Sequence, residues 1–583
     1  MITAQIDEPI LPAKESTQRK PLRLWPGIIG AVLVALGWFV VPTAIQRVAG
    51  PAMLTGVFGA LVIAVWWLVF SRARWFERLG AVVLIIFALI GTKRLVHESI
   101  AGGGMGYLLY VLSVPVVSLA FVVWAVATRR LTNGIRRVTL VAAVMIVCGG
   151  FLLIRTGGIT AEFDNDLHWR WSLTPEQQLI AQAANEPTAA PAASVSAGTG
   201  VNWPGFRGPE RDGVVRGTRI KTDWSASRPV ELWRRSIGPA WSSFAVQGDR
   251  IYTQEQRGNE EIVSCYNLNT GKPVWLHRDA ARFYESNAGP GPRGTPTLNN
   301  GRVYTLGATG IVNALNADTG AVIWSRNAAS DTKIKTPTWG FASSPLVVDD
   351  VVIVAAAGAM AAYDVDNGNP RWFGPADNSG YSSPHLATIG GVKQVLMLNG
   401  IGLISFSATD GKELWRYVLP PGARIVQPAI TAEGDILTND GESSSLRRLT
   451  TTSGPNGWAV TERWESSGLN PYFSDFVVHK GHAFGFAGSN IACIDLKDGN
   501  RKWKGGSYGH GQLVLLSDQD LLLIVSEEGE LALVKATPDV FTELGRFPAI
   551  KGKTWNHPVL AGDTVLVRNG EEMAAFRLAL VDR

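Results

Sequence analysis

Cysteine is scarce in this chain. Three cysteines among 583 residues are too few for a scaffold stapled by disulfides. Charged side chains are also few, since Asp, Glu, Lys and Arg make up 18 % of the sequence, where about 25 % is usual in soluble domains. Because 46 % of the residues are hydrophobic, this low charge excludes intrinsic disorder. The length exceeds what one core supports, so we expect at least two domains.

Excess positive charge is confined to the N-terminal part. Residues 1–160 carry fifteen Lys and Arg against five Asp and Glu, a net charge of +10, whereas the remainder carries 39 against 44, a net charge of −5. The pI of about 9.0 therefore does not indicate nucleic-acid binding, and we expect no nucleic-acid partner. The mean hydropathy of +0.10 is the average of an apolar part and a polar part.

Five apolar runs follow one another in the N-terminal part. A helix needs about 20 apolar residues to cross a bilayer, and the third run is the weakest because its uncharged part ends at Thr92, before Lys93 and Arg94. No Asp, Glu or Lys lies in the middle of a run, although transporters usually need such a residue, so the runs predict a membrane anchor. The runs lie at residues 22–41, 51–70, 79–95, 105–127 and 138–154.

Basic residues alternate between the connections of these runs. They are frequent before residue 24, at 72–78 and at 129–137, and rare around residue 47. The positive-inside rule then places the N-terminus in the cytoplasm and, after five crossings, the C-terminal part in the periplasm of a Gram-negative cell. We expect a cytoplasmic tail over 1–21, a five-helix anchor in the inner membrane over 22–155, a juxtamembrane segment and Ala/Pro/Ser-rich linker over 156–200, and a second domain over 201–583.

A unit of strand, turn and strand recurs after residue 201. Two copies are SCYNLNTGKPVW at 264–275 and NALNADTGAVIW at 313–324, in which a tryptophan follows the turn glycine by four residues. Glycine permits the positive φ that a tight hairpin needs. The turn glycines are Gly271, Gly320, Gly368, Gly411 and Gly499. The repeat tryptophans are Trp233, Trp275, Trp324, Trp372, Trp415, Trp464 and Trp503.

The period of this unit predicts a β-propeller. Seven steps lead from Trp233 to Phe547, which we take as the aromatic residue of the last copy, and they average about 45 residues. Such a period with four short strands is typical of propeller blades. The Trp233 strand has no unit before it and extra strands end the chain, so both termini should build an eighth blade that closes the ring. The predicted fold class is an all-α transmembrane bundle followed by an all-β eight-bladed propeller.

The repeat resembles that of PQQ-type (quinoprotein-like) propellers, a family that includes quinoprotein dehydrogenases and BamB-like proteins. NWPGFRGPERDG at 202–213 resembles the opening segment of bacterial members. The resemblance implies two alternative functions. One is a scaffold that binds a periplasmic protein, peptide or glycan without a cofactor or metal. The other is a membrane-bound dehydrogenase that oxidises a sugar or alcohol with PQQ and Ca²⁺ and passes electrons to quinone.

The scaffold is the favoured alternative. The propeller is short for such dehydrogenases, and no adjacent cysteine pair is present to stack on PQQ, since Cys265 and Cys493 belong to different repeats. The starts of the innermost strands carry aromatic and hydrogen-bonding groups, as a ligand site requires. Asp475, in one of these starts, is the candidate base of the enzymatic alternative. The predicted ligand-binding rim comprises Trp241, Arg293, Trp339, Tyr381, Ser383, His385, Arg424, Gln427, Tyr472, His510, Trp555, Asn556 and His557.

Overall fold

A computed structural model of the chain divides into two compact units. The first holds residues 1–156 and 167–171, and the second holds residues 157–166 and 172–583. The predicted tail over 1–21 and most of the predicted linker lie outside the described residues. The structure describes residues 22–40, 49–160, 165–183, 202–374, 380–441, 445–455 and 457–581.

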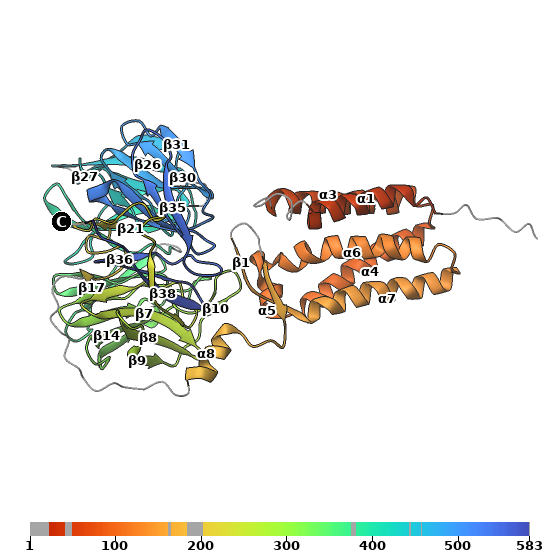
Figure 1. Ribbon diagram of the computed structural model, residues 1–583, viewed down its shortest axis with the longest axis horizontal. Coiled ribbons are helices and arrows are strands. Elements are labelled where there is room, and N and C mark those ends of the chain that lie inside the picture. The colour runs from red at the N-terminus through yellow and green to blue at the C-terminus, as the bar shows by residue number, and fades with distance from the viewer. Residues whose placement is uncertain are drawn as a thin grey trace, which may run out of the picture. The chain divides into compact units, whose positions relative to one another are not determined.

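Helices occupy all five apolar runs of the first unit (Figure 1). Among the described residues, three helices are long and apolar enough to cross a membrane, namely α4, α6 and α7, and Trp25–Val40 and Gly56–Phe70 are shorter apolar helices. The helix of the third run is longer than the run itself, because it begins at Trp75. The elements are α1 (Trp25–Ala35), η1 (Leu36–Val40), α3 (Ala49–Val65), η2 (Trp66–Phe70), α4 (Trp75–Lys93), α5 (Glu98–Gly102), η3 (Gly104–Gly106), α6 (Leu108–Ala127) and α7 (Asn133–Leu152).

Small residues and aromatic rings hold these helices together. Helices α1 and α3 approach so closely that a Cβ on Gly59 would lie 2.5 Å from Val34 Cγ2, as at the small-residue interfaces of membrane helices. Trp67, at the end of the second helical run, packs edge-on against Phe121 of α6 at a centroid distance of 4.8 Å. These contacts form one apolar cluster within the unit.

The second unit is an eight-bladed β-propeller (Figure 1). It is preceded by the strands β1 (Ile154–Ile159) and β2 (Asn165–Trp169) and by the helix α8 (Pro175–Ala183). Thr174 caps α8 reciprocally with Gln177, because each backbone N–H donates to the side chain of the other residue, at 2.9 and 3.1 Å. Glu176 attaches this helix to blade 1, because it accepts a hydrogen bond from Gly258 N at 2.8 Å and forms an ion pair with Arg282.

Apart from the eighth, each blade has four consecutive antiparallel strands, and the sheets of blades 1 and 7 each gain a fifth strand from the segment 202–215. Blade 1 holds β6 (Ala245–Gln247), β7 (Arg250–Arg257), β8 (Glu260–Asn267) and β9 (Pro273–Asp279); blade 2 holds β12 (Thr297–Asn299), β13 (Arg302–Leu306), β14 (Ile311–Asn316) and β15 (Val322–Asn327); blade 3 holds β16 (Leu346–Val348), β17 (Val351–Ala356), β18 (Ala359–Asp364) and β19 (Pro370–Phe373); blade 4 holds β20 (His385–Ile389), β21 (Val392–Asn399), β22 (Gly402–Ser407) and β23 (Glu413–Val418).

The remaining blades continue in chain order. Blade 5 holds β24 (Ala429–Ile430), β25 (Ile436–Asn439), β26 (Leu446–Gly454) and β27 (Gly457–Ser466); blade 6 holds β28 (Val477–His479), β29 (His482–Ala487), β30 (Asn490–Asp495) and β31 (Arg501–Gly505); blade 7 holds β32 (Gln512–Leu516), β33 (Leu521–Val525), β34 (Glu530–Lys535) and β35 (Glu543–Pro548). Smaller elements are β10 (Tyr284–Glu285), β11 (Gly289–Pro290), α9 (Ala328–Thr332) and η5 (Ser517–Gln519).

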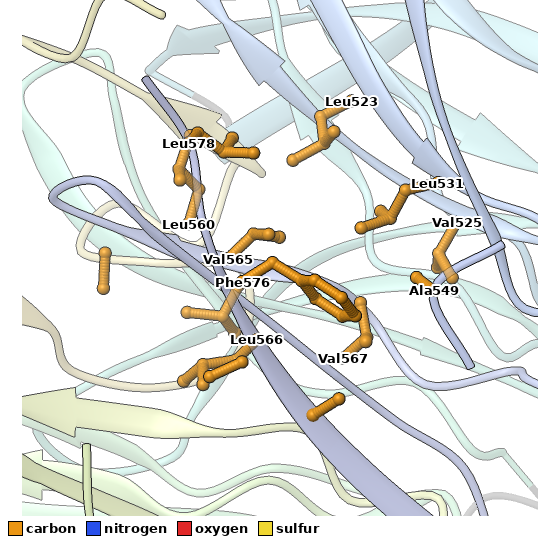
Figure 2. Packing of buried hydrophobic residues seen from close by; sticks show 14 of the residues in the cluster. Leu523, Val525, Leu531, Ala549, Leu560, Val565, Leu566, Val567, Phe576 and Leu578 are labelled. Carbon is orange, nitrogen blue, oxygen red and sulfur yellow. The ribbon is translucent and has the colours of Figure 1, made fainter. Parts of the chain in front are cut away.

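Blade 8 joins the two ends of the propeller. Its strands β36 (Val559–Ala561), β37 (Thr564–Arg568) and β38 (Glu572–Arg577) pair with β5 (Val230–Ser236), which carries Trp233. The predicted fold class and the predicted closure by both termini are therefore confirmed. The core between blades 7 and 8 is one cluster of aliphatic and aromatic side chains, in which Leu523 and Leu531 of blade 7 belong with Phe576 of blade 8 (Figure 2).

In five of the eight blades, the repeat tryptophan docks on the turn glycine of the next blade. The indole of Trp275 donates to Ala317 O at 2.9 Å, and its ring lies against Gly320, where a Cβ would be only 2.5 Å from Trp275 Cε3. Gly320 also has a φ of +72°, so side-chain size and backbone conformation both require glycine. The same stacking recurs in the pairs Trp233–Gly271, Trp324–Gly368, Trp372–Gly411 and Trp464–Gly499.

Three blades depart from this pattern. The indole of Trp503 donates to Thr537 O at 2.7 Å, but the turn at 536–542 of blade 7 contains no glycine. The indole of Trp415 donates to Gln394 within its own blade, at 2.8 Å, because blade 5 has a long β26–β27 hairpin in place of the glycine turn. The expectation for Phe547 was wrong. In blades 1 to 6 the repeat tryptophan lies on the outermost strand and pairs with the residue just before a β-bulge in the neighbouring strand. In blade 7 the residue at the tryptophan's position is Gly545. Trp224 fills the space beside Gly545, 3.3 Å from where its Cβ would be.

Candidate functional site

A belt of hydrogen bonds joins the starts of the innermost strands. The backbone N–H of Ser243 donates to Thr295 Oγ1 at 3.0 Å, Thr295 N donates to Ser344 Oγ at 2.9 Å, and Ser344 N donates to Ser383 Oγ at 2.9 Å. Gln427 continues the belt by donating to Ser383 O at 3.3 Å. The repeated serine and threonine of the strand starts therefore fasten each blade to the next.

Amide side chains complete the belt in the later blades. Gln512 of blade 7 donates to Phe473 O at 2.9 Å and accepts from Asp475 N at 3.1 Å. Asn556 of blade 8 donates to Ser242 O of blade 1 at 2.7 Å. Of the residues predicted for the rim, Ser383, Gln427 and Asn556 thus have their polar groups directed into neighbouring blades.

The segment 202–216 closes the channel within this belt, and we call it the plug. Its first strand β3 (Asn202–Trp203) pairs with β6 of blade 1, and its last strand β4 (Val214–Val215) pairs in parallel with β32 of blade 7. Between them, Arg207 and Arg211 have φ angles of +61° and +54°, which side chains rarely adopt. The tight turn directs both guanidinium groups into the channel, where both are buried.

Asp475 is the counter-charge of the plug. Its carboxylate lies 3.3 Å from Arg207 Nη1 and 2.7 Å from His557 Nε2, and it is 1 % exposed. Burial opposes ionisation, but the Arg207 charge and the His557 hydrogen bond together hold the pKa of Asp475 below its ordinary value. Asp475 and His557 therefore hold the plug in place, and the Asp475 carboxylate stays ionised and shielded from solvent.

Aromatic side chains gather where the innermost strands begin, and we call Trp241, Tyr472, Phe473, His510 and Trp555 the aromatic mouth. The rings of Trp241 and Trp555 lie 4.9 Å apart, Trp555 lies 4.9 Å from Phe473, and Phe473 stacks on His510 at 5.2 Å. Tyr472 extends the array at 5.5 Å. All five rings are half-buried, so each keeps part of its surface open to a ligand.

Lys553 brings a positive charge to the aromatic mouth. Its Nζ lies 4.4 Å from the Trp555 centroid and 5.2 Å from that of Trp241, distances typical of cation–π contacts. Burial lowers the pKa of Lys553 to about 8. Lys553 and Phe473 are not among the residues predicted from the sequence, although both are close neighbours of predicted rim residues in the chain.

The other predicted rim residues lie apart from this array. Trp339 and Tyr381 form a second aromatic pair at 4.9 Å. Arg293 donates to Trp339 O at 3.0 Å and has its pKa lowered by burial to about 10. Arg424 is fully buried and donates to Asn399 O at 2.8 Å. These two arginines therefore brace the loops around the channel, and His385 lies deeper, beside the plug.

A PQQ–Ca²⁺ centre does not fit the donor groups of this channel. Ca²⁺ takes six to eight oxygen ligands, several of them carboxylates, and within the part of the chain that the structure describes no three His, Cys, Asp or Glu side chains are grouped to hold a metal. The buried carboxylate of Asp475 is already paired with Arg207, and Arg211 adds a second positive charge beside it. These charges would repel a divalent cation.

Comparison with known proteins agrees with the fold. The profile of the family described as outer membrane protein assembly factor BamB matches residues 226–383, 259–432 and 395–579. BamB of Yersinia pestis is 22 % identical over 326 residues, which are 52 % of this chain and 70 % of that protein. BamB of Shewanella oneidensis is 27 % identical over 156 residues, which are 25 % of this chain and 36 % of that protein.

Two of the solved structures to which the chain is similar have names from the two branches of the resemblance. The crystal structure of BamB from Moraxella catarrhalis is 14 % identical with a TM-score of 0.45, over 60 % of this chain and 100 % of that one. Quinohemoprotein alcohol dehydrogenase from Comamonas testosteroni is 13 % identical with a TM-score of 0.39, over 70 % and 85 %. The family matches together extend over more than half of the sequence. The chain therefore belongs to the family of the outer membrane protein assembly factor BamB.

Proposed function

We propose that this chain is a membrane-anchored scaffold whose propeller binds a periplasmic protein through the aromatic mouth. The observation that carries the proposal is the continuous array of half-buried rings with Lys553 above it. Aromatic side chains dominate the binding energy of protein interfaces, because they supply large contact area at a small cost in side-chain entropy.

The charge pattern of the N-terminal part supports the proposed location. Its basic residues are concentrated on alternate connections, which supports a cytoplasmic N-terminus and a five-helix anchor in the inner membrane. The relatives are named as assembly factors for outer membrane proteins, and this supports a periplasmic propeller and a protein as its partner. A glycan, which aromatic rings can also bind, is the other ligand to be tested.

The plug favours binding over catalysis. A dehydrogenase of this fold needs its channel for cofactor and substrate, whereas here Arg207, Arg211 and Asp475 fill the channel and are buried. The alternative can be tested directly by incubating the full chain with PQQ and Ca²⁺. We expect no quinone absorbance on the purified protein and no dye reduction with sugars or alcohols, and either one would contradict the scaffold.

The partner can be sought with a photo-crosslinking residue placed in the mouth. We would replace Trp241 in cells and, as the matched control, Phe373, an aromatic residue on the outer strand of blade 3 that is 45 % exposed. The proposal expects an adduct with one identified envelope protein from position 241 and none from position 373. Equal adducts from both positions, or adducts with glycan alone, would contradict it.

A further inference from the structure

A hollow lies at the other end of the channel from the aromatic mouth. Its volume is about 540 Å³, and it is bordered by the plug, by the innermost strands of blades 4 and 5 and by the turn after β28 in blade 6. The innermost strands run from the mouth towards these turns, so the mouth and the hollow occupy opposite ends of the propeller. We call this hollow the plug cavity.

Arg211 of the plug lines the plug cavity. It is 7 % exposed, and its guanidinium donates to Pro345 O at 2.9 Å and Ser344 O at 3.1 Å. Its Nε has no hydrogen-bond partner among the described residues. Burial, together with the charge of Arg207, lowers the pKa of Arg211 to about 9, which leaves the side chain protonated at neutral pH. Carbonyl oxygens satisfy two of its donors but do not neutralise its charge.

The other cations around the plug cavity already have acidic partners. The remaining acid of the lining, Glu210, is exposed at the rim, where water weakens its influence. The paired groups are Arg207 with Asp475 at 3.3 Å, Arg216 with Asp212 at 2.5 Å, Lys480 with Asp520 at 2.7 Å, His479 with Asp520 at 2.6 Å, and Arg448 with Glu433 at 3.3 Å. Among the residues that the structure describes, no acidic side chain is therefore left to compensate the charge of Arg211.

His385 supplies a second polar group to the same cavity. It opens β20, is 6 % exposed, and its Nδ1 has no partner among the described residues. Burial and the charges of Arg211 and Arg207 lower the pKa of His385 to about 3. The imidazole is thus neutral at physiological pH and can donate one N–H without adding charge.

We propose that the plug cavity binds an oxyanion, the carboxylate or phosphate group of a small molecule, between Arg211 and His385. A guanidinium group matches the geometry of carboxylate and phosphate oxygens, and an anion would neutralise the buried charge that the protein leaves unpaired. The site is independent of the aromatic mouth, because none of the mouth residues lines the plug cavity.

Thermal unfolding of the full chain in detergent tests this site. Inorganic phosphate and acetate would be titrated separately against chloride at constant ionic strength, because a ligand that binds the native state raises the unfolding midpoint. We compare wild type, Arg211→Gln and Arg278→Gln. Arg278 is the matched control, since it lies on β9 and pairs with Glu260 at 2.8 Å on the exposed surface.

The expected result is a rise of the midpoint for wild type and Arg278→Gln with at least one of the two anions, and an apparent affinity weakened roughly tenfold or more for Arg211→Gln. A response to phosphate alone or to acetate alone identifies which oxyanion the site takes. No response of wild type to either anion up to about 10 mM, or equal responses of both variants, would overturn the proposal.

Hydrogen exchange keeps the test decisive if Arg211→Gln does not fold. In wild-type protein, the anion that raises the midpoint should slow amide exchange in the plug and at residues 385–388, which line the cavity. Protection confined to other parts of the chain would place the anion elsewhere and contradict the proposal. The mouth is unchanged in every protein used, so this outcome does not depend on partner binding.

Discussion

Replacing Gly320 with alanine should destabilise the propeller through the contact between blades 1 and 2. The new Cβ would lie 2.5 Å from the ring of Trp275, and alanine would have to adopt the φ of +72°, which it disfavours. The left-handed backbone costs about 1–2 kcal/mol, and overpacking costs about 1–3 kcal/mol more. We therefore expect a loss of roughly 2–5 kcal/mol.

The magnitude translates into a measurable shift of the unfolding temperature. An unfolding entropy of about 2.1 cal/mol/K per residue gives the propeller, with its ~380 residues, about 0.8 kcal/mol/K. A loss of ~3 kcal/mol then lowers the midpoint by about 4 °C. The assay is the loss of the β-sheet circular dichroism band on heating the full chain in detergent, at one fixed scan rate because large proteins often unfold irreversibly.

Gly301 provides the matched control for the backbone contribution. Its φ is +71°, but a Cβ there would meet nothing within 4 Å. Gly301→Ala should therefore show only the backbone cost of about 1–2 kcal/mol, which lowers the midpoint by about 1–2.5 °C. If Gly301→Ala and Gly320→Ala lowered the midpoint equally, the ring of Trp275 would not be what requires glycine at position 320, and the account of how the blades dock would be refuted.

Three further predictions concern charge and topology. Asp475→Asn leaves the Arg207 charge unpaired and should lower the free energy of unfolding by about 3–5 kcal/mol at pH 7. Because the pKa of Asp475 is lowered in the native state, its ionised form stabilises the fold above about pH 4. In thermal unfolding, the difference between the variant and wild type should therefore shrink as the pH falls below that value. Burial and nearby Asp279 raise the pKa of Glu261 to about 7, so the contribution of Glu261 to stability falls as the pH rises from about 4 to 7; relative to wild type, Glu261→Gln should gain up to ~3 kcal/mol at pH 8 and little at pH 4, and equal gains at both pH values in thermal unfolding would contradict this burial cost. Ala226→Cys, at an exposed position of a chain whose three cysteines are buried, should react with a membrane-impermeant maleimide on cells with a permeabilised outer membrane, and protection until lysis would contradict the periplasmic location.

The propeller could be predicted because its blades repeat a local rule. The spacing of glycine and tryptophan is set by contacts between adjacent blades, so Trp275 and Gly320 are visible as a pattern in the sequence. The prediction for Phe547 was wrong because aromatic character alone does not fix the strand register. The residue in the repeat position, Gly545, has no side chain, and Trp224 reaches it from outside the repeat.

The site was less predictable because its contacts join distant segments. The strand starts were recognised as polar and aromatic, but nothing local distinguishes Gln427, which bridges two blades, from Trp555, which stays half-open in the mouth. The motif around Arg207 and Arg211 suggested only a resemblance. That these arginines enter the channel depends on the pairing of β3 with blade 1 and β4 with blade 7.

The affinity of the identified partner for mouth variants tests the central claim most directly. Trp555→Ala removes the ring that contacts Trp241, Phe473 and Lys553, and removal of such a binding residue typically costs 2 kcal/mol or more. The account predicts that the Kd rises roughly 30-fold or more for Trp555→Ala and stays unchanged for Phe373→Ala. Equal affinities of wild type and Trp555→Ala would contradict the aromatic mouth as the binding surface.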